Sequence, residues 1–70
     1  MPILSVAAME KLLRKAGSER VSKRAATELS KALEEVGVEI GRDATELAKH
    51  AGRKTVVDED IKLARKKSKQ

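Results

Sequence analysis

Residues 22–50 read SKRAATELSKALEEVGVEIGRDATELAKH and form the longest helical pattern in this chain of 70 residues. Apolar side chains recur on one face of it, at Ala25, Leu29, Ala32, Leu33, Val36, Ile40, Ala44, Leu47 and Ala48. Ser22 can cap its start, and no proline interrupts it. Such a helix would be about 42 Å long, too long for the two short flanking segments to cover. The stretch therefore predicts a long helix that needs a partner.

Two similar segments flank this pattern, Gly17–Ser22 and Gly52–Asp58. Each begins with a glycine that can end a helix, continues through basic and β-branched residues, and finishes on a Ser or Asp that can cap the next helix. An apolar stripe with helical spacing lies between a possible capping residue, Ser5, and the first glycine. The chain is therefore expected to be all-α, with a short helix, a long central helix and a short helix.

Composition limits how this chain can become stable. A single chain of this size buries only about 60% of its unfolded surface, and the sequence contains no Cys, Phe, Trp or Tyr. Disulfides and large aromatic core residues are therefore absent, and dimerisation is the expected remedy. No apolar run approaches the roughly 20 residues that span a bilayer, so we expect a soluble, intracellular protein.

Two glycines lie in the middle of the long pattern, at Gly37 and Gly41. Each costs roughly 1 kcal/mol relative to alanine inside a helix. Close approach of a second helix, crossing antiparallel about a two-fold axis, would offset that cost. The alternative is that these positions simply tolerate glycine.

The net charge is +5, and its signs are segregated along the chain. Lys11–Arg24 holds six basic residues and one acidic residue. Glu28–Glu46 holds two basic and six acidic residues, and Lys49–Gln70 holds eight basic and three acidic residues. Basic ends around an acidic middle indicate that the turns and termini contact a polyanion. The alternative is a basic protein whose charges are merely solvated.

Catalysis and metal binding are poorly supported. The chain has no cysteine, no glycine-rich phosphate loop and no serine with a base at recognisable spacing, so no catalytic residue is predicted. The single histidine, His50, has no metal-ligand companion, and a buried or interfacial role is expected for it. We therefore expect no enzyme, metal, cofactor or small-molecule substrate.

Two motifs resemble those of archaeal-type histones: AGSERVS at residues 16–22, and AKHAGRKTV at residues 48–56 followed by EDIKLA at residues 59–64. The resemblance covers about residues 6–67, which leaves residues 1–5 as an N-terminal segment outside it and residues 68–70 as a basic tail. It implies the histone fold, paired head to tail as an obligate handshake homodimer or as a heterodimer with a paralogue. The two turns would then meet across the dimer as short parallel strand pairs.

The resemblance also implies which residues contact DNA. Arg20 resembles an arginine that enters the minor groove, with the hydroxyl of Thr55 beside it to hold the guanidinium. The positions that match DNA-contacting ones are Lys11, Arg14, Arg20, Ser22, Lys54 and Thr55. Lys23 and Arg24 stand where relatives commonly carry acids, and they suggest extra phosphate contacts because positive charge there opposes the helix dipole.

Two further sets of residues are implied for structure and assembly. Arg53 and Asp60 resemble an ion pair within one chain that fixes the second turn against the third helix. Leu47, His50, Asp60 and Leu63 match the surface through which family dimers join into tetramers and longer assemblies. In that contact His50 would donate a hydrogen bond to Asp60 of the facing dimer.

These features predict a chromatin protein that binds, bends and compacts double-stranded DNA without reading its sequence, in the cytoplasm and on the chromosome. No helix carries the Arg, Asn and Gln cluster that major-groove readout requires. The main alternative is a histone-fold dimer that scaffolds a transcription or replication complex with little direct DNA wrapping. A weaker alternative, a basic amphipathic helix on an anionic membrane, conflicts with apolar residues spread over three capped helices.

Overall fold

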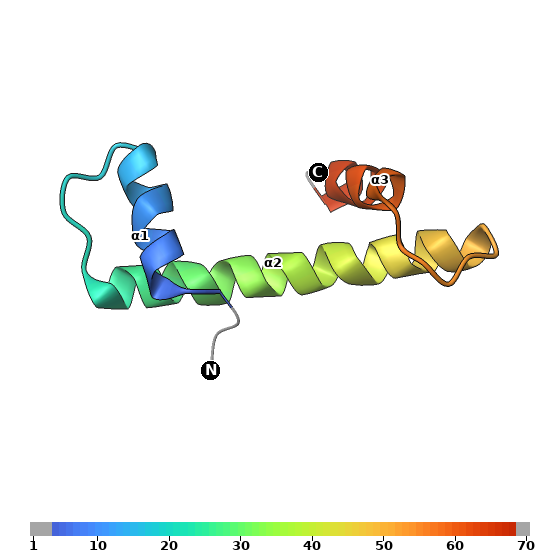
Figure 1. Cartoon of the computed structure of the whole chain (residues 1–70), viewed down its shortest axis with the longest axis horizontal. Helices are drawn as coiled ribbons and strands as arrows, with labels where there is room; N and C mark the ends of the chain where they lie inside the picture. Colours follow the sequence, from blue (N-terminus) through green and yellow to red (C-terminus); the bar gives the residue numbers. More distant parts are fainter. Residues whose placement is uncertain (1–3, 69–70) are drawn as a thin grey trace. The chain divides into compact units, whose positions relative to one another are not determined.

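The computed structural model describes residues 4–68 as three α-helices: α1 (Val6–Lys15), α2 (Lys23–His50) and α3 (Asp58–Ser68) (Figure 1). The expected all-α order of short, long and short helix is confirmed. Residues 1–3 of the predicted N-terminal segment and residues 69–70 of the predicted basic tail lie outside the described residues. Contacts divide the chain into an N-terminal unit, Met1–Glu35, and a C-terminal unit, Val36–Gln70, and α2 contributes to both.

Serine side chains cap the first two helices. Ser5 Oγ accepts a hydrogen bond from the Ala8 N–H at 3.1 Å. Ser22 Oγ accepts one from the Ala25 N–H at 3.0 Å. Each hydroxyl satisfies a backbone donor that has no partner inside the helix, so both predicted caps are confirmed.

The cap of α3 differs from the prediction. Asp58 is already the first residue of the helix, so it does not cap it. Val57 occupies the cap position, since its carbonyl accepts hydrogen bonds from the N–H groups of Asp60 and Ile61. The Asp60 carboxylate reaches back to accept a hydrogen bond from the Val57 N–H at 2.9 Å. This contact is the reciprocal half of a capping box, made from the third helical position.

A Schellman motif ends α1. Gly17 has a φ of +110°, a value that L residues with a Cβ rarely adopt. The Gly17 N–H donates to the Arg14 carbonyl at 3.0 Å, and the Ser18 N–H donates to the Leu13 carbonyl at 3.0 Å. These two bonds satisfy carbonyls that the helix leaves free, and the chain leaves α1 in a defined direction.

The same motif ends α2. Gly52 has a φ of +72°. Its N–H donates to the Lys49 carbonyl at 2.9 Å, and the Arg53 N–H donates to the Ala48 carbonyl at 2.9 Å. The likeness between the two turns, first visible in the sequence, is therefore a likeness of backbone hydrogen bonding.

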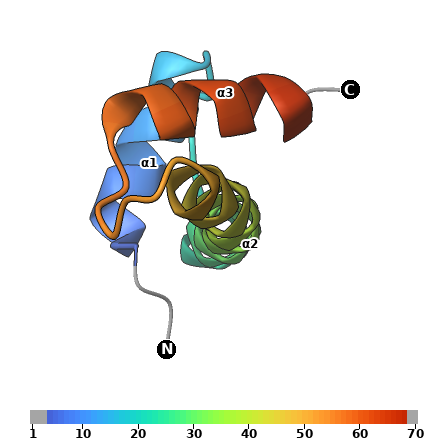
Figure 2. The ribbon, with the colours of Figure 1, turned by 90° about the vertical axis from the view of Figure 1, so that its right-hand side faces the viewer.

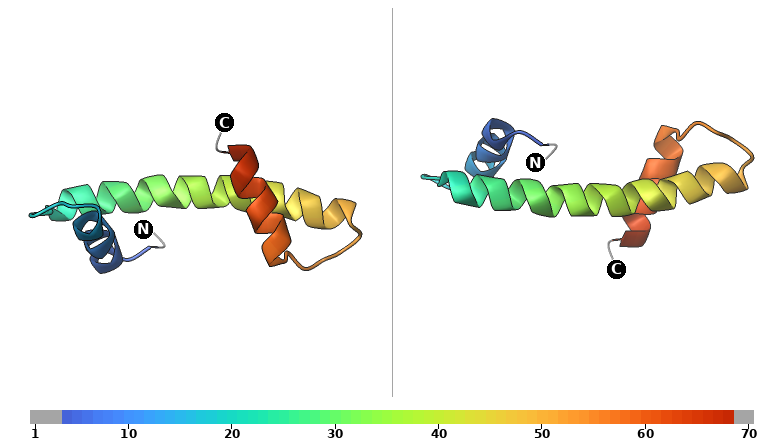
Figure 3. Two further views of the ribbon diagram at one scale, coloured as in Figure 1. Left: turned by 90° about the horizontal axis from the view of Figure 1, so that it is seen from above. Right: turned by 90° about the horizontal axis from the view of Figure 1, so that it is seen from below.

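In the N-terminal unit, α1 crosses the first turns of α2 (Figures 1 and 3). Met9 of α1 and Ala26 and Ser30 of α2 are buried there. Ala25, which the predicted stripe included, is exposed instead. The buried side of α2 is thus displaced from the predicted stripe by part of a turn, because the position of α1 decides which neighbouring residues become covered.

In the C-terminal unit, α3 crosses the second half of α2 (Figures 2 and 3). Ala44 and Ala48 of α2 are buried, as are Asp60 and Ala64 of α3. Each pair is spaced by four residues and therefore lies on one side of its helix. Three of the four side chains are single methyl groups, which allow the two helix backbones to approach closely.

Several large apolar side chains remain exposed in the single chain. They are Leu12, Val36, Val38, Val56, Ile61 and Leu63, each 38–53% exposed. A Cβ added at Gly37 or Gly41 would meet no atom within 4 Å outside its own stretch of helix. No close contact among residues 4–68 therefore offsets the cost of these two glycines, and the second helix expected to cross α2 stays a prediction.

Candidate nucleic-acid interface

The loop between α1 and α2 exposes both of the residues predicted to act there, Arg20 and Ser22. Its first end is held by the Schellman hydrogen bonds of Gly17 and its second end by the Ser22 cap. Lys23 and Arg24 follow in the first turn of α2 and are also exposed. Positive charge at this end of a helix opposes the helix dipole, so these two residues do not stabilise α2.

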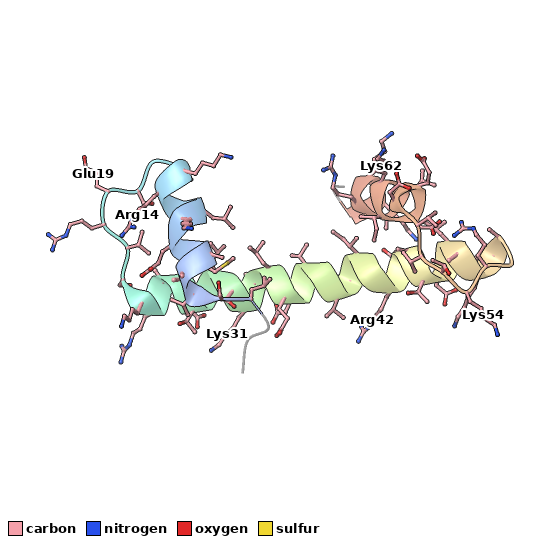
Figure 4. All side chains as sticks on the ribbon, in the orientation of Figure 1. Arg14, Glu19, Lys31, Arg42, Lys54 and Lys62 are labelled. Carbon is pink, nitrogen blue, oxygen red and sulfur yellow. The ribbon has the colours of Figure 1, made fainter. Side chains whose placement is uncertain are left out.

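Two further predicted cations, Lys11 and Arg14, lie on α1 and are exposed. At the helical repeat they lie about 140–160° around the helix axis from Met9, which is buried. Both therefore lie on the side of α1 that faces away from α2. By contrast, Lys31 projects from α2 itself (Figure 4) and lies 3.3 Å from a Glu28 carboxylate oxygen.

The loop between α2 and α3 is held by Arg53 and Asp60. Arg53 Nη1 donates to Asp60 Oδ2 at 2.8 Å, and Arg53 Nη2 donates to Asp60 Oδ1 at 2.9 Å. Arg53 Nη1 also donates to the Thr55 carbonyl at 2.9 Å. With the bond from the Val57 N–H to the same carboxylate, this network ties three positions of the loop, Arg53, Thr55 and Val57, to Asp60 of α3.

This network shifts the pKa values of both Asp60 and Arg53. The hydrogen bond from Arg53 and then that from the Val57 N–H lower the pKa of Asp60 from 3.8 to about 2, against the opposing effect of desolvation. The bond to Asp60 raises the pKa of Arg53 above its ordinary value. Arg53 is therefore occupied inside the loop, while Lys54 and Thr55 are exposed and Lys54 projects from the loop (Figure 4).

Among the described residues, no acid forms an ion pair with the cations predicted to contact DNA. Within residues 4–68, the ion pairs with defined partners use Lys31, Arg53 and Lys62. The predicted cations outside these pairs are Lys11, Arg14, Arg20, Lys23, Arg24 and Lys54. Their charges are consequently free to attract an external anion.

A hollow of about 380 Å³ in the C-terminal unit brings together three of the four residues predicted for assembly. Its lining residues are Asp43, Glu46, Leu47, His50, Leu63, Ala64 and Lys67. Asp60, the fourth, does not line it: this residue is 3% exposed and accepts three hydrogen bonds from its own chain. The two acids and Lys67 were missed, although Asp43 and Lys67 each lie four residues from a lining leucine and Glu46 lies four residues before His50.

Within residues 4–68, no group of three His, Asp or Glu side chains is placed to hold a metal ion. In the same part of the chain, no helix has the length and apolar character needed to cross a membrane.

Comparison with known proteins identifies the family. The model of the family described as "Histone-like transcription factor (CBF/NF-Y) and archaeal histone" matches residues 3–64. This chain belongs to the archaeal histone family. The three-helix order with a long central helix is the histone fold of that family, and the family is non-enzymatic.

Two relatives match almost the whole chain. The chain is 55% identical over 64 residues to one subunit of the archaeal histone HAN1 of Thermococcus zilligii, and the match covers 91% of this chain and 96% of that protein. It is 50% identical over 64 residues to "Probable archaeal histone 3" of Methanocaldococcus jannaschii, with the same shares covered. The resemblance expected from the two motifs is therefore confirmed over nearly the full length.

Proposed function

We propose that this archaeal histone binds, bends and compacts double-stranded DNA without reading its base sequence, as a head-to-tail dimer on the chromosome. The observation that carries the proposal is the pair of matched loops at the two ends of α2. Each loop starts at a Schellman motif, is closed by a helix cap and exposes polar or cationic side chains. Both relatives that match the chain are named as archaeal histones.

In the proposed dimer, the first loop of one chain lies beside the second loop of its partner. Arg20 enters the minor groove, and Thr55 of the partner holds its guanidinium. Ser22 and Lys54 contact backbone phosphates. Because hydrogen bonds fix both loops at their ends, the loop backbones lose little conformational freedom on binding. The DNA must bend to reach successive sites.

The remaining cations extend this contact. Lys11 and Arg14 on the outward side of α1 reach phosphates near the centre of the dimer. Lys23 and Arg24 reach phosphates beside the first loop. All four side chains are exposed, so they can approach DNA without rearrangement of the helices.

The exposed apolar side chains support the dimer. Five large hydrophobic residues other than Leu63 are 38–46% exposed in the single chain, and a partner chain would remove them from water: Leu12, Val36, Val38, Val56 and Ile61. Gly37, exposed near the middle of α2, would let the partner's α2 approach. A homodimer is the simplest form, and a heterodimer with a paralogue is its alternative because the HAN1 relative is named as one subunit of a histone.

The hollow beside α3 supports assembly beyond the dimer. Leu47 and Leu63 line it, and we propose that they pack against the same surface of a second dimer, with His50 donating to Asp60 of the facing dimer. Asp60 Oδ1 accepts one hydrogen bond from its own chain, so it retains the capacity for a second one.

Arg20→Ala tests the proposed function. The variant should bind a DNA duplex more weakly by about 2–4 kcal/mol per dimer, since two symmetric arginines are lost. Circular dichroism and dimer mass should stay unchanged, because Arg20 is exposed in a loop. Arg42→Ala is the matched control, since it removes an exposed arginine of α2 that lies in neither loop. Equal affinities of Arg20→Ala and the parent at about 100 mM salt would refute the role of this loop.

The same titrations separate DNA wrapping from a scaffolding role. Wrapping predicts that log affinity falls with log salt by about 0.9 per phosphate neutralised, with similar affinities for unrelated duplexes. The family description also covers histone-like transcription factors, which keeps the scaffold as the second candidate. A folded dimer without salt-sensitive duplex binding would favour that scaffold.

A further inference from the structure

Among the described residues of the N-terminal unit, 4–35, Ser30 is the one buried polar residue, and none of its surface is exposed. Its hydroxyl donates to the Leu4 carbonyl at 3.0 Å, across 26 positions of sequence. The two threonine hydroxyls of α2, on Thr27 and Thr45, donate instead to carbonyls of their own helix. Ser30 therefore makes a tertiary hydrogen bond where its helix does not require one.

The Leu4 carbonyl lies immediately before α1. Ser5, the next residue, caps that helix through the Ala8 N–H, so the bond from Ser30 ties the start of α1 to α2. Among residues 4–35, the other buried side chains are those of Met9 and Ala26. Since α1 has ten residues, it is too short to be stable alone. Its position therefore depends on packing against α2, and the bond from Ser30 adds a directional contact to that packing.

The cations proposed to meet DNA lie farther along α1. Arg14 follows Val6 by eight residues, which is about 12 Å along the helix axis. A rotation of α1 by about 15° around its anchored start would displace that end by about 3 Å, roughly the length of a hydrogen bond. A small loss of anchoring at Leu4 would therefore be enough to separate Arg14 from a phosphate.

We propose that Ser30 is a positioning residue whose buried hydroxyl holds the start of α1 so that Lys11 and Arg14 are aligned with DNA phosphates. The inference rests on the proposed function. It concerns α1 alone, because the loop that carries Arg20 has its own cap at Ser22 and its own backbone hydrogen bonds.

Ser30→Ala removes the hydroxyl without weakening α2 itself, because alanine has a higher helix propensity than serine. It leaves the Leu4 carbonyl without this donor at a partly buried contact. Thr45→Ala is the matched control, since it removes a hydroxyl of the same helix that donates within the helix. If Ser30→Ala fails to fold, Ser30→Cys replaces it in the experiment, because the thiol is similar in size to the hydroxyl and is only a weak hydrogen-bond donor.

The experiment combines amide hydrogen exchange with duplex titrations of the parent, Ser30→Ala, Arg14→Ala and the double variant. Exchange at Ala8 and Met9 should become faster in Ser30→Ala and not in Thr45→Ala. Each single substitution should weaken duplex binding by about fivefold. In the double variant, the effect of Arg14→Ala should shrink to about twofold or less, because an Arg14 that is already misplaced contributes little. Arg20→Ala should keep its full effect in the Ser30→Ala background.

Equal effects of Arg14→Ala in both backgrounds would overturn the positioning role and leave Ser30 merely structural. Unchanged exchange at Ala8 and Met9 would overturn the anchor itself, whether or not DNA binds. A parent chain that fails to bind duplex DNA would refute the proposed function and with it the positioning role, while the exchange measurement would still report on the anchor.

Discussion

Asp60 and Ser30 are the two buried polar residues among residues 4–68, and each joins a short helix to another part of the chain. Asp60 connects the start of α3 to Arg53 in the preceding loop. Ser30 connects the start of α1 to α2 through Leu4. Both sites follow the rule that a buried polar group is stable only when its hydrogen bonds are satisfied, and no buried side-chain nitrogen or oxygen is unpaired in this part of the chain.

Acid should destabilise the fold through Asp60. Its pKa is about 2 in the folded chain, below the ordinary value of 3.8. Because the folded pKa is the lower one, Asp60 stabilises the folded state above pH 3.8, and this contribution is lost as the pH falls from 3.8 to about 2. Thermal unfolding followed from neutral pH down through this range measures the loss. Asp60→Asn should be less stable at neutral pH and should show a weaker dependence across the same range; an undiminished dependence would contradict the assignment to Asp60.

The ends of the helices are the features that matter at the scale of elements. The two Schellman motifs and the caps at Ser22 and Asp60 define where each loop begins and ends. The loops are thereby short connectors with fixed ends, and the exposed side chains at Arg20 and Lys54 emerge from them.

Gly17→Ala should destabilise the chain more than Gly52→Ala. Neither site has an atom within 4 Å of an added Cβ, so the difference comes from the backbone alone. Gly52, with a φ of +72°, lies near the left-handed helical region, where alanine costs roughly 1–2 kcal/mol. Gly17, with a φ of +110°, lies outside that region. Alanine at this position should therefore cost more free energy than alanine at Gly52. Urea unfolding of both variants measures the order, and equal or reversed losses would contradict it.

At the scale of the whole molecule, stability should belong to the dimer. Five apolar side chains are buried among the described residues: Met9, Ala26, Ala44, Ala48 and Ala64. Four of these are alanines, which is a small core for 70 residues. The proposed partner chain would supply the rest of the apolar contact.

Gly37→Ala decides whether a second helix crosses α2 at its middle. In a helix without a partner, alanine should stabilise the fold by roughly 1 kcal/mol, since nothing else lies within 4 Å of an added Cβ. In the proposed dimer, the added methyl group should meet the partner's α2 and lower the melting temperature. The measurement is thermal unfolding at several protein concentrations. A stabilised variant would refute a close crossing at this glycine.

Leu47→Glu tests assembly beyond the dimer. Leu47 is half-buried on the hollow beside α3, so a charge there should leave a folded, DNA-binding dimer but abolish larger particles on DNA. Particle mass measured with and without duplex DNA distinguishes these states. Thr45→Glu is the control, since it places the same charge at an exposed polar residue of α2 that does not line the hollow. If Leu47→Glu unfolds the dimer, Leu47 belongs to the core and the proposed contact is wrong.

The sequence by itself determined the three helices, the two glycine turns and the serine caps, because these depend on interactions within about four residues. The tertiary structure decided the rest. Helical periodicity permits neighbouring stripes of α2 to be buried, and only the packing of α1 selected Ala26 and Ser30 over Ala25. Capping of α3 moved from Asp58 to Val57 and Asp60 because the Asp60 carboxylate is held by Arg53, seven residues away. The bond from Ser30 to Leu4 spans 26 positions, and no local pattern signals a contact that exists only once two helices have packed together.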